Sequence, residues 1–242
     1  MSAFAGIFHF DEQPVERELL YSFGHALSIQ NPDGGYEVFT DSVGMVYRGF
    51  PTNKHSLNEV QPHASGSGTI ICWDGRLDNR EDLLAGCRLI DAELTDVEIV
   101  SASYDAHGPK FLKSLVGDFA LALWDVATRT LMLARDAIGP RPLYYCKRDN
   151  AIIFCSSLSV LADLSQITIE VNDDYVAGHL TRGVEPHLTP YLGIFAVPPG
   201  HVTVCCNGRV STERYWKLNP NNVISYASER CLLYTSPSPR DS

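Results

Sequence analysis

The sequence predicts an α+β fold built around antiparallel hairpins, and three observations support this prediction. Residues 117–125 (GDFALALWD) alternate between two apolar faces, which is typical of a strand buried on both sides. Residues 125–129 then interrupt the apolar run with residues that suit a short hairpin loop, and residues 131–134 (LMLA) resume it as a second strand. Stretches with the periodicity of amphipathic helices lie on both sides of this hairpin.

The elements before this hairpin are short. Residues 2–8 predict a strand at the very start of the chain, where ends generally fray, so neighbouring structure must hold it. Residues 16–27 place their apolar side chains on one helical face. Residues 36–50 alternate well enough for two strands joined near residues 41–42, and residues 70–73 predict another strand.

Helices are expected at four further places: residues 80–85, 96–106, 157–164 and 171–180. Thr95 and Glu98 form the pattern of a capping box at the start of the second, and Asn172 is the expected N-cap of the last.

Two turn signals place strands around these helices. Gly139-Pro140-Arg141-Pro142 predicts a stiff turn that leads into a third strand at residues 143–145. Asn207-Gly208 predicts a hairpin between residues 202–206 and 209–216.

Composition limits the classes of protein that fit. The chain has 242 residues, enough for one large core or two small ones, and a formal net charge of -10. No stretch gathers Lys and Arg on one face, which argues against nucleic acid or an anionic membrane as partner. Neither a secretory leader nor an apolar run long enough to cross a bilayer is present, so a cytoplasmic protein is expected.

The seven cysteines are odd in number, and several lie in apolar, strand-like runs, so reduced and buried thiols are expected rather than a disulfide framework. No Cys or His spacing suggests a metal site.

Three long motifs resemble one family. GDFALALWD, LARDAIGPRPLYY and FCSSLSVLADL occur in this order and are similar to the amidotransferase half of the asparagine synthetases. The resemblance extends from Phe4 to Trp216. It implies a class II glutamine amidotransferase-like domain at residues 1–216, with the four-layer αββα sandwich of the N-terminal-nucleophile hydrolases and two stacked, mainly antiparallel sheets.

The resemblance also implies where the catalytic groups would lie. In working members of the family the residue after the initiator Met is a Cys that attacks glutamine, with its own α-amine as base. Here that position is Ser2. Ser2 is small enough for Met1 to be removed, so a hydroxyl nucleophile is chemically possible. The simpler alternative is that Ser2 is only a small residue at a chain start.

The oxyanion site departs from the family pattern as well. The family's NGEIYN is replaced by Asp74-Gly75-Arg76-Leu77-Asp78-Asn79. The Gly75 N–H donor can survive, but Asp74 places a carboxylate where negative charge must develop, and Arg76 would repel the α-ammonium group of glutamine. We therefore expect the glutaminase activity of this domain to be lost.

Two further residues match family positions that hold glutamine. Arg48 lies where the family's arginine binds the carboxylate, although a solvated arginine at a strand end fits the sequence equally well. Asp96 matches the aspartate that binds the amino group. Its structural alternative is a helix-start residue that favours the positive end of the helix dipole.

The end of the chain does not match the family. Members continue into a synthetase domain that is expected to use ATP and magnesium. Its SGGxDS loop would bind the departing pyrophosphate, and no such loop occurs here. Residues 217–230 are expected to begin the linker to that missing domain. Residues 231–242 resemble translated sequencing-adapter DNA, so we exclude them from reasoning about the fold.

The leading hypothesis is the amidotransferase-like part of a truncated asparagine-synthetase-type ligase, whose parent forms amide bonds with ATP on a small-molecule or peptide substrate. Branches of this kind include the lasso peptide cyclases and the β-lactam synthetases. One alternative is an active amidohydrolase that uses Ser2. Another is a free-standing binding module.

Overall fold

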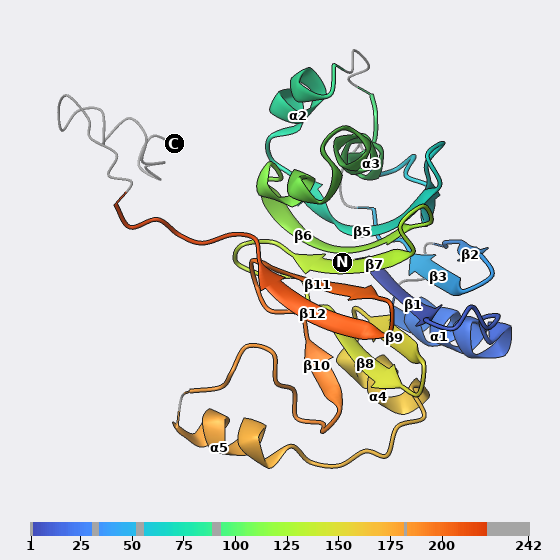
Figure 1. Cartoon of the computed structure of the whole chain (residues 1–242), viewed down its shortest axis with the longest axis vertical. Helices are drawn as coiled ribbons and strands as arrows, with labels where there is room; N and C mark the ends of the chain where they lie inside the picture. Colours follow the sequence, from blue (N-terminus) through green and yellow to red (C-terminus); the bar gives the residue numbers. More distant parts are fainter. Residues whose placement is uncertain (1, 31–33, 52–55, 89–92, 182, 222–242) are drawn as a thin grey trace, which may run out of the picture.

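The computed structural model describes residues 2–30, 34–51, 56–88, 93–181 and 183–221. Two six-stranded antiparallel sheets form its centre (Figure 1). Sheet A has the order β10-β8-β9-β1-β3-β2, and sheet B has the order β12-β11-β7-β6-β5-β4.

The strands of sheet A are β1 (Ala3–His9), β2 (Glu37–Phe39), β3 (Val43–Arg48), β8 (Tyr144–Arg148), β9 (Ala151–Cys155) and β10 (Ile194–Ala196). The strands of sheet B are β4 (His63–Ala64), β5 (Thr69–Leu77), β6 (Gly117–Asp125), β7 (Thr130–Arg135), β11 (His201–Cys206) and β12 (Arg209–Arg214). The helices are α1 (Arg17–Gln30), α2 (Arg80–Gly86), α3 (Asp96–His107), the 3-10 helix η1 (Gly108–Lys113), α4 (Leu158–Leu164) and α5 (Asp173–Thr181).

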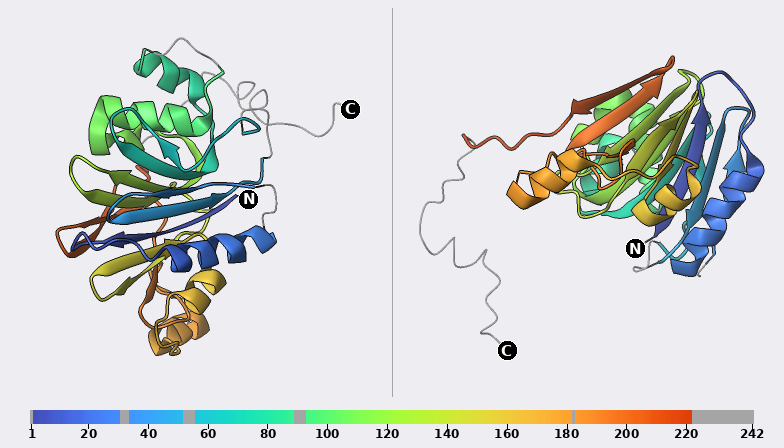
Figure 2. Two further views of the ribbon diagram at one scale, coloured as in Figure 1. Left: turned by 90° about the vertical axis from the view of Figure 1, so that its right-hand side faces the viewer. Right: turned by 90° about the horizontal axis from the view of Figure 1, so that it is seen from below.

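Helices cover the outer face of each sheet, so the molecule has the four layers that the family resemblance implies (Figure 2). Helices α1 and α4 pack on sheet A, and α2, α3 and η1 pack on sheet B. A middle core fills the space between the sheets. The expected αββα sandwich is confirmed.

Strand β6 explains why sheet B stands between two apolar layers. Phe119, Leu121 and Leu123 face the α3 side, whereas Ala120, Ala122 and Trp124 face sheet A. The two-sided burial predicted from the alternation is therefore confirmed. The β6–β7 loop follows Asp125, whose Oδ1 accepts from the Ala127 and Thr128 N–H groups.

The turn at residues 139–142 carries the chain from one sheet to the other. Strand β7 lies in sheet B, while β8 lies in sheet A and pairs with β9. The buried carboxylate of Asp136 fixes this crossing. Its Oδ1 accepts from the Ile138 and Gly139 N–H groups at 2.8 Å each, and its Oδ2 accepts from the Phe119 N–H at 3.0 Å.

Several element boundaries differ from the sequence prediction. Helix α5 begins at Asp173, because Val171 instead forms an isolated bridge with Tyr191. Strand β12 ends at Arg214, because the Tyr215 and Trp216 N–H groups both donate to the Gly200 carbonyl. Strands β4, β9 and β10 were not predicted. The Asn207-Gly208 turn is confirmed, with φ values of 49° and 74°.

The described cysteines are all free. Burial raises the pKa of Cys146, Cys155 and Cys205 to about 12, and that of Cys72 further, so these thiols remain protonated and unreactive. Cys231 lies outside the described residues. None of the described helices combines the length and the apolar character that crossing a bilayer requires.

We expect Asp136→Asn to lower the free energy of unfolding by about 2–3 kcal/mol, because the amide NH2 would meet the Phe119 N–H donor in a buried site. Urea denaturation checks this value, with the exposed Asp41→Asn as control. Equal stability of the two variants would contradict the role given to the Asp136 carboxylate.

Candidate functional site

Ser2 lies directly before β1, which runs between β3 and β9 within sheet A. The Phe50 N–H donates to Ser2 Oγ at 3.0 Å, and the Tyr47 hydroxyl is a second hydrogen-bond partner of the Ser2 side chain. These contacts hold the start of the chain. They meet the requirement that a strand at the chain terminus be tied down.

Asp74 reaches Ser2 from the other sheet. It lies in β5, its side chain is 5% exposed, and its carboxylate accepts a hydrogen bond from the Ser2 backbone N–H. Burial raises the pKa of Asp74, and the nearby charge and hydrogen bond of Arg141 offset this only in part. The structure thus brings together two residues that the sequence singled out separately.

Arg141 is the partner of Asp74 and was missed by sequence reasoning. Its Nη1 donates to Asp74 Oδ1 at 2.7 Å, and its Nε is buried with no hydrogen-bond partner among the described residues. The available signal was Asp74 itself, since a carboxylate in a buried strand needs a cation. Sequence alone does not show which arginine supplies it.

Gly75 is held by close packing. A Cβ at this position would lie 2.6 Å from the Trp73 ring and 2.8 Å from the Asp118 carbonyl oxygen. No larger residue fits without moving the strand.

Arg76 is largely exposed to solvent. Its guanidinium group is paired with Asp78 at 2.8 Å and lies 3.8 Å from Asp118, and its side chain is 57% exposed. These carboxylates raise the pKa of Arg76, so it stays charged. Its predicted effect on a substrate ammonium group stays a prediction.

Asp96 is engaged by the protein itself. Its Oδ2 accepts from the Leu77 N–H at 3.0 Å, and its Oδ1 forms an ion pair with Arg80. The capping box that Thr95 and Glu98 predict is also present at the start of α3. Asp96 therefore has the structural role at the start of α3 that was considered as the alternative. Its binding of a substrate amine stays a prediction.

Arg48 is likewise bound by neighbouring groups. Its Nε donates to Ser28 Oγ at 2.8 Å and to the Gly24 carbonyl at 3.1 Å, and its Nη2 contacts Glu37 at 2.5 Å. The side chain therefore packs against α1 and β2. It is not the solvated strand-end arginine considered above, and a role in carboxylate binding stays a prediction.

A cavity of about 380 Å³ lies beside two residues that contact Ser2, although Ser2 itself does not line it. Tyr47 and Phe50, which both contact Ser2, line it together with Tyr36 and Glu59. Glu59 was not predicted. Its Oε1 accepts from the Val97 N–H at 3.1 Å, and burial raises its pKa to about 7, with the charges of Asp96 and Asp74 adding to the shift.

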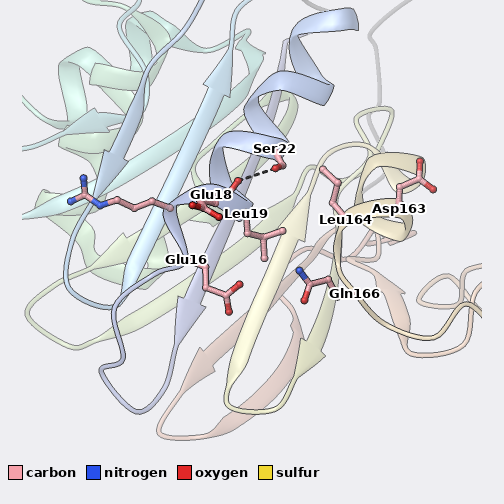
Figure 3. A pocket seen from close by; sticks show the side chains of 8 residues that line it. Glu16, Glu18, Leu19, Ser22, Asp163, Leu164 and Gln166 are labelled. Carbon is pink, nitrogen blue, oxygen red and sulfur yellow. Dashed lines mark hydrogen bonds between the residues drawn. The ribbon is translucent and has the colours of Figure 1, made fainter.

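A larger hollow of about 660 Å³ lies elsewhere, between the start of α1 and the end of α4 (Figure 3). Glu16, Glu18 and Asp163 line it, and none of the predicted site residues does. Among the described residues no group of three His, Cys, Asp or Glu side chains is arranged to hold a metal.

The fold and the position of Ser2 define the class of protein: a two-sheet sandwich of the N-terminal-nucleophile hydrolase type. Structural similarity supports this class, because the glutamine phosphoribosylpyrophosphate amidotransferase of B. subtilis aligns with a TM-score of 0.62 at 16% identity, over 88% of this chain and 49% of that one. The family model described as "Glutamine amidotransferase domain" matches residues 1–216. The chain therefore belongs to the glutamine amidotransferase domain family.

Its curated relatives include asparagine synthetases. Glutamine-hydrolysing asparagine synthetase 2 of Bacillus subtilis is 24% identical over 211 residues, 83% of this chain and 28% of the relative. Asparagine synthetase 1 of the same organism is 25% identical over 90% of this chain and 36% of its own length. The chain thus spans about a third or less of these relatives.

Glu59 gives a pH-dependent prediction. A carboxyl group whose pKa is about 7 when folded and 4.5 when unfolded stabilises the fold below pH 4.5 and loses that contribution as the pH rises through 7. We expect the free energy of unfolding of Glu59→Gln, relative to that of the unsubstituted chain, to increase by about 2 kcal/mol between pH 5 and pH 8.

Urea denaturation at the two pH values measures this difference, and an NMR titration of the Glu59 carboxyl carbon supplies the midpoint. A midpoint near 4.5, or a difference that does not change with pH, would contradict the burial argument.

Proposed function

We propose that this chain is the amidotransferase-like part of an asparagine-synthetase-type ligase and that its glutaminase activity has been lost. The observation that carries the proposal is the Asp74–Arg141 ion pair beside Ser2, where the family places a neutral oxyanion donor. The sequence match to the amidotransferase half of asparagine synthetases supports the parent class.

The Asp74 carboxylate disfavours amide hydrolysis on Ser2 in two ways. A tetrahedral intermediate formed on Ser2 would carry an oxyanion, and a carboxylate nearby repels it instead of donating a hydrogen bond. Loss of one oxyanion donor alone costs about 10²–10³ in rate. The same carboxylate would also favour the protonated form of a Ser2 α-amine, which reduces its capacity to act as a base.

The Ser2 hydroxyl is also a weaker nucleophile than the cysteine thiol of working family members. A hydroxyl has a much higher pKa than a thiol and needs a stronger base to become a nucleophile. The Ser2 hydroxyl has two hydrogen-bond partners from sheet A and its neighbouring loop, Tyr47 and the Phe50 N–H. Burial raises the pKa of Tyr47, so this neighbour stays a neutral phenol and does not supply that base.

The two groups expected to bind glutamine are already satisfied by protein partners. Arg48 is held by Glu37 and Ser28, and Asp96 is held by Arg80 and the Leu77 N–H. Releasing either group for a substrate would leave its present partner without a charge or hydrogen bond, which is costly in a partly buried site.

In this proposal, ligase chemistry belongs to a domain that follows residue 216 in a longer parent. That domain would use ATP and magnesium to convert a carboxylate into an acyl-adenylate, with release of pyrophosphate. An amine nitrogen would then attack the acyl carbon, forming the amide and releasing AMP. The nitrogen would come from ammonia or from an amine on the substrate itself, as in the lasso peptide cyclases and β-lactam synthetases.

A second candidate function is amide hydrolysis by Ser2. The observation in its favour is the cavity of about 380 Å³ whose lining residues Tyr47 and Phe50 contact the Ser2 side chain. The charge of Asp74 makes this function the weaker candidate.

We expect the protein with Met1 removed to release no ammonia from glutamine above the uncatalysed rate, and Ser2→Cys to remain equally inactive because Asp74 still opposes the oxyanion. A coupled ammonia assay checks both, with a glutamine-hydrolysing asparagine synthetase as positive control.

Two results would count against this reading of the site. If the unsubstituted chain releases ammonia and Ser2→Ala does not, the hydrolase alternative is established. Ammonia release by Ser2→Cys alone would contradict the role assigned to Asp74.

A further inference from the structure

Helix α5 buries none of its nine residues. Val176 and Leu180 lie one helical turn apart and are 41% and 79% exposed. From Tyr175 to Thr181 the helix carries no Lys, Arg, Asp or Glu. A helix whose outer face meets only water normally places charged residues there, so this face has the composition of a covered surface.

Exposed large apolar side chains are more frequent in the segment around this helix than in the rest of the described chain. Among the described residues, five of the sixteen exposed large hydrophobic side chains come from residues 169–192, here named the α5 arm. They are Ile169, Val171, Val176, Leu180 and Leu192. Concentrated exposure of this kind marks an interaction surface more often than isolated apolar residues do.

The base of the α5 arm is firmly attached to the sandwich. Thr189 is 1% exposed, and its hydroxyl donates to the Ile194 carbonyl at 2.8 Å. The Asn172 N–H donates to the Pro190 carbonyl at 2.9 Å, and Tyr191 packs against the outer core of sheet A. The arm therefore presents α5 on a fixed base, so a partner loses little entropy in ordering it.

The chain leaves the sandwich on the side where the α5 arm projects. In Figure 1 and in the right-hand view of Figure 2, α5 and residues 215–221 both extend from the side opposite α1. The Tyr215 hydroxyl donates to the Arg135 carbonyl at 2.7 Å, which fixes the start of this exit. Trp216 and Leu218 on the exiting segment are also exposed.

We propose that the α5 arm is the docking surface for the domain that follows residue 216 in the parent protein. This inference rests on the proposed function, and the lengths of the relatives support it, because the chain spans only 28% and 36% of two asparagine synthetases. A domain tethered on the same side reaches the arm at a high effective concentration, which favours it over a second copy of the chain.

The composition of the arm specifies the surface that it fits. Val176 and Leu180 require an apolar depression, and Asp173 and Asp174 at the first turn of α5 favour Lys or Arg at its rim. The docked surface is thus apolar at its centre and basic at one edge.

The test compares the 242-residue chain with the longer protein encoded by the complete reading frame, recovered by sequencing outward from this coding region. Hydrogen exchange measures the amides of residues 177–181. We expect these amides to exchange at least tenfold more slowly in the longer protein.

Leu180→Gln and Ile29→Gln make a matched pair for the second measurement. Each residue is the penultimate one of its helix, with 79% and 78% of its surface exposed, but Ile29 lies on α1 at the opposite side. We expect Leu180→Gln to restore fast exchange in residues 177–181 of the longer protein and Ile29→Gln to leave it slow.

The outcomes separate the two proposals. A reading frame without a further domain overturns both. A longer protein that carries an ATP-dependent ligase domain, but whose residues 177–181 exchange as fast as in the 242-residue chain, overturns only the docking proposal. Equal effects of Leu180→Gln and Ile29→Gln overturn it as well.

Discussion

The buried carboxylate of Asp136 is the contact on which both the sandwich and the candidate site depend. It accepts hydrogen bonds from backbone N–H groups of β6 and of the turn that follows β7, where the chain passes from sheet B to sheet A. The Asp136 backbone carbonyl also accepts a hydrogen bond from the Gly200 N–H, which attaches the segment before β11 to this crossing. Because this crossing is fixed, Arg141 emerges from it at hydrogen-bond distance from Asp74. One side chain thus links the topology to the electrostatics beside Ser2.

Most of the fold could be predicted from local patterns. Both faces of β6 and β7 pack against apolar layers, so both sets of alternating residues in these strands are apolar. Strands β9 and β10 were not predicted as elements. Their places in sheet A depend on pairing with β8, and β10 has only three residues, so it carries too little local signal. Sequence periodicity reports on burial, whereas strand order depends on contacts between distant segments.

The candidate site shows the same division. Family motifs identified Ser2, Asp74 and Asp96, because these residues stand at positions with a known chemical role. The ion-pair partners Arg141 and Arg80 were not found, since they lie 67 and 16 residues from the carboxylates that they bind. Glu59 was missed for another reason: only folding against the N-terminus of α3 removes it from water. A residue type predicts chemistry, but its ionisation depends on its surroundings.

Gly75 is required by packing, independently of any activity of the site. Its Cα hydrogen faces the Trp73 ring and the Asp118 carbonyl, and neither contact involves a substrate. Packing alone is therefore sufficient to require a glycine at this position. A glycine here is therefore no evidence of glutaminase activity, whereas the preceding residue, Asp74, gives the site its carboxylate.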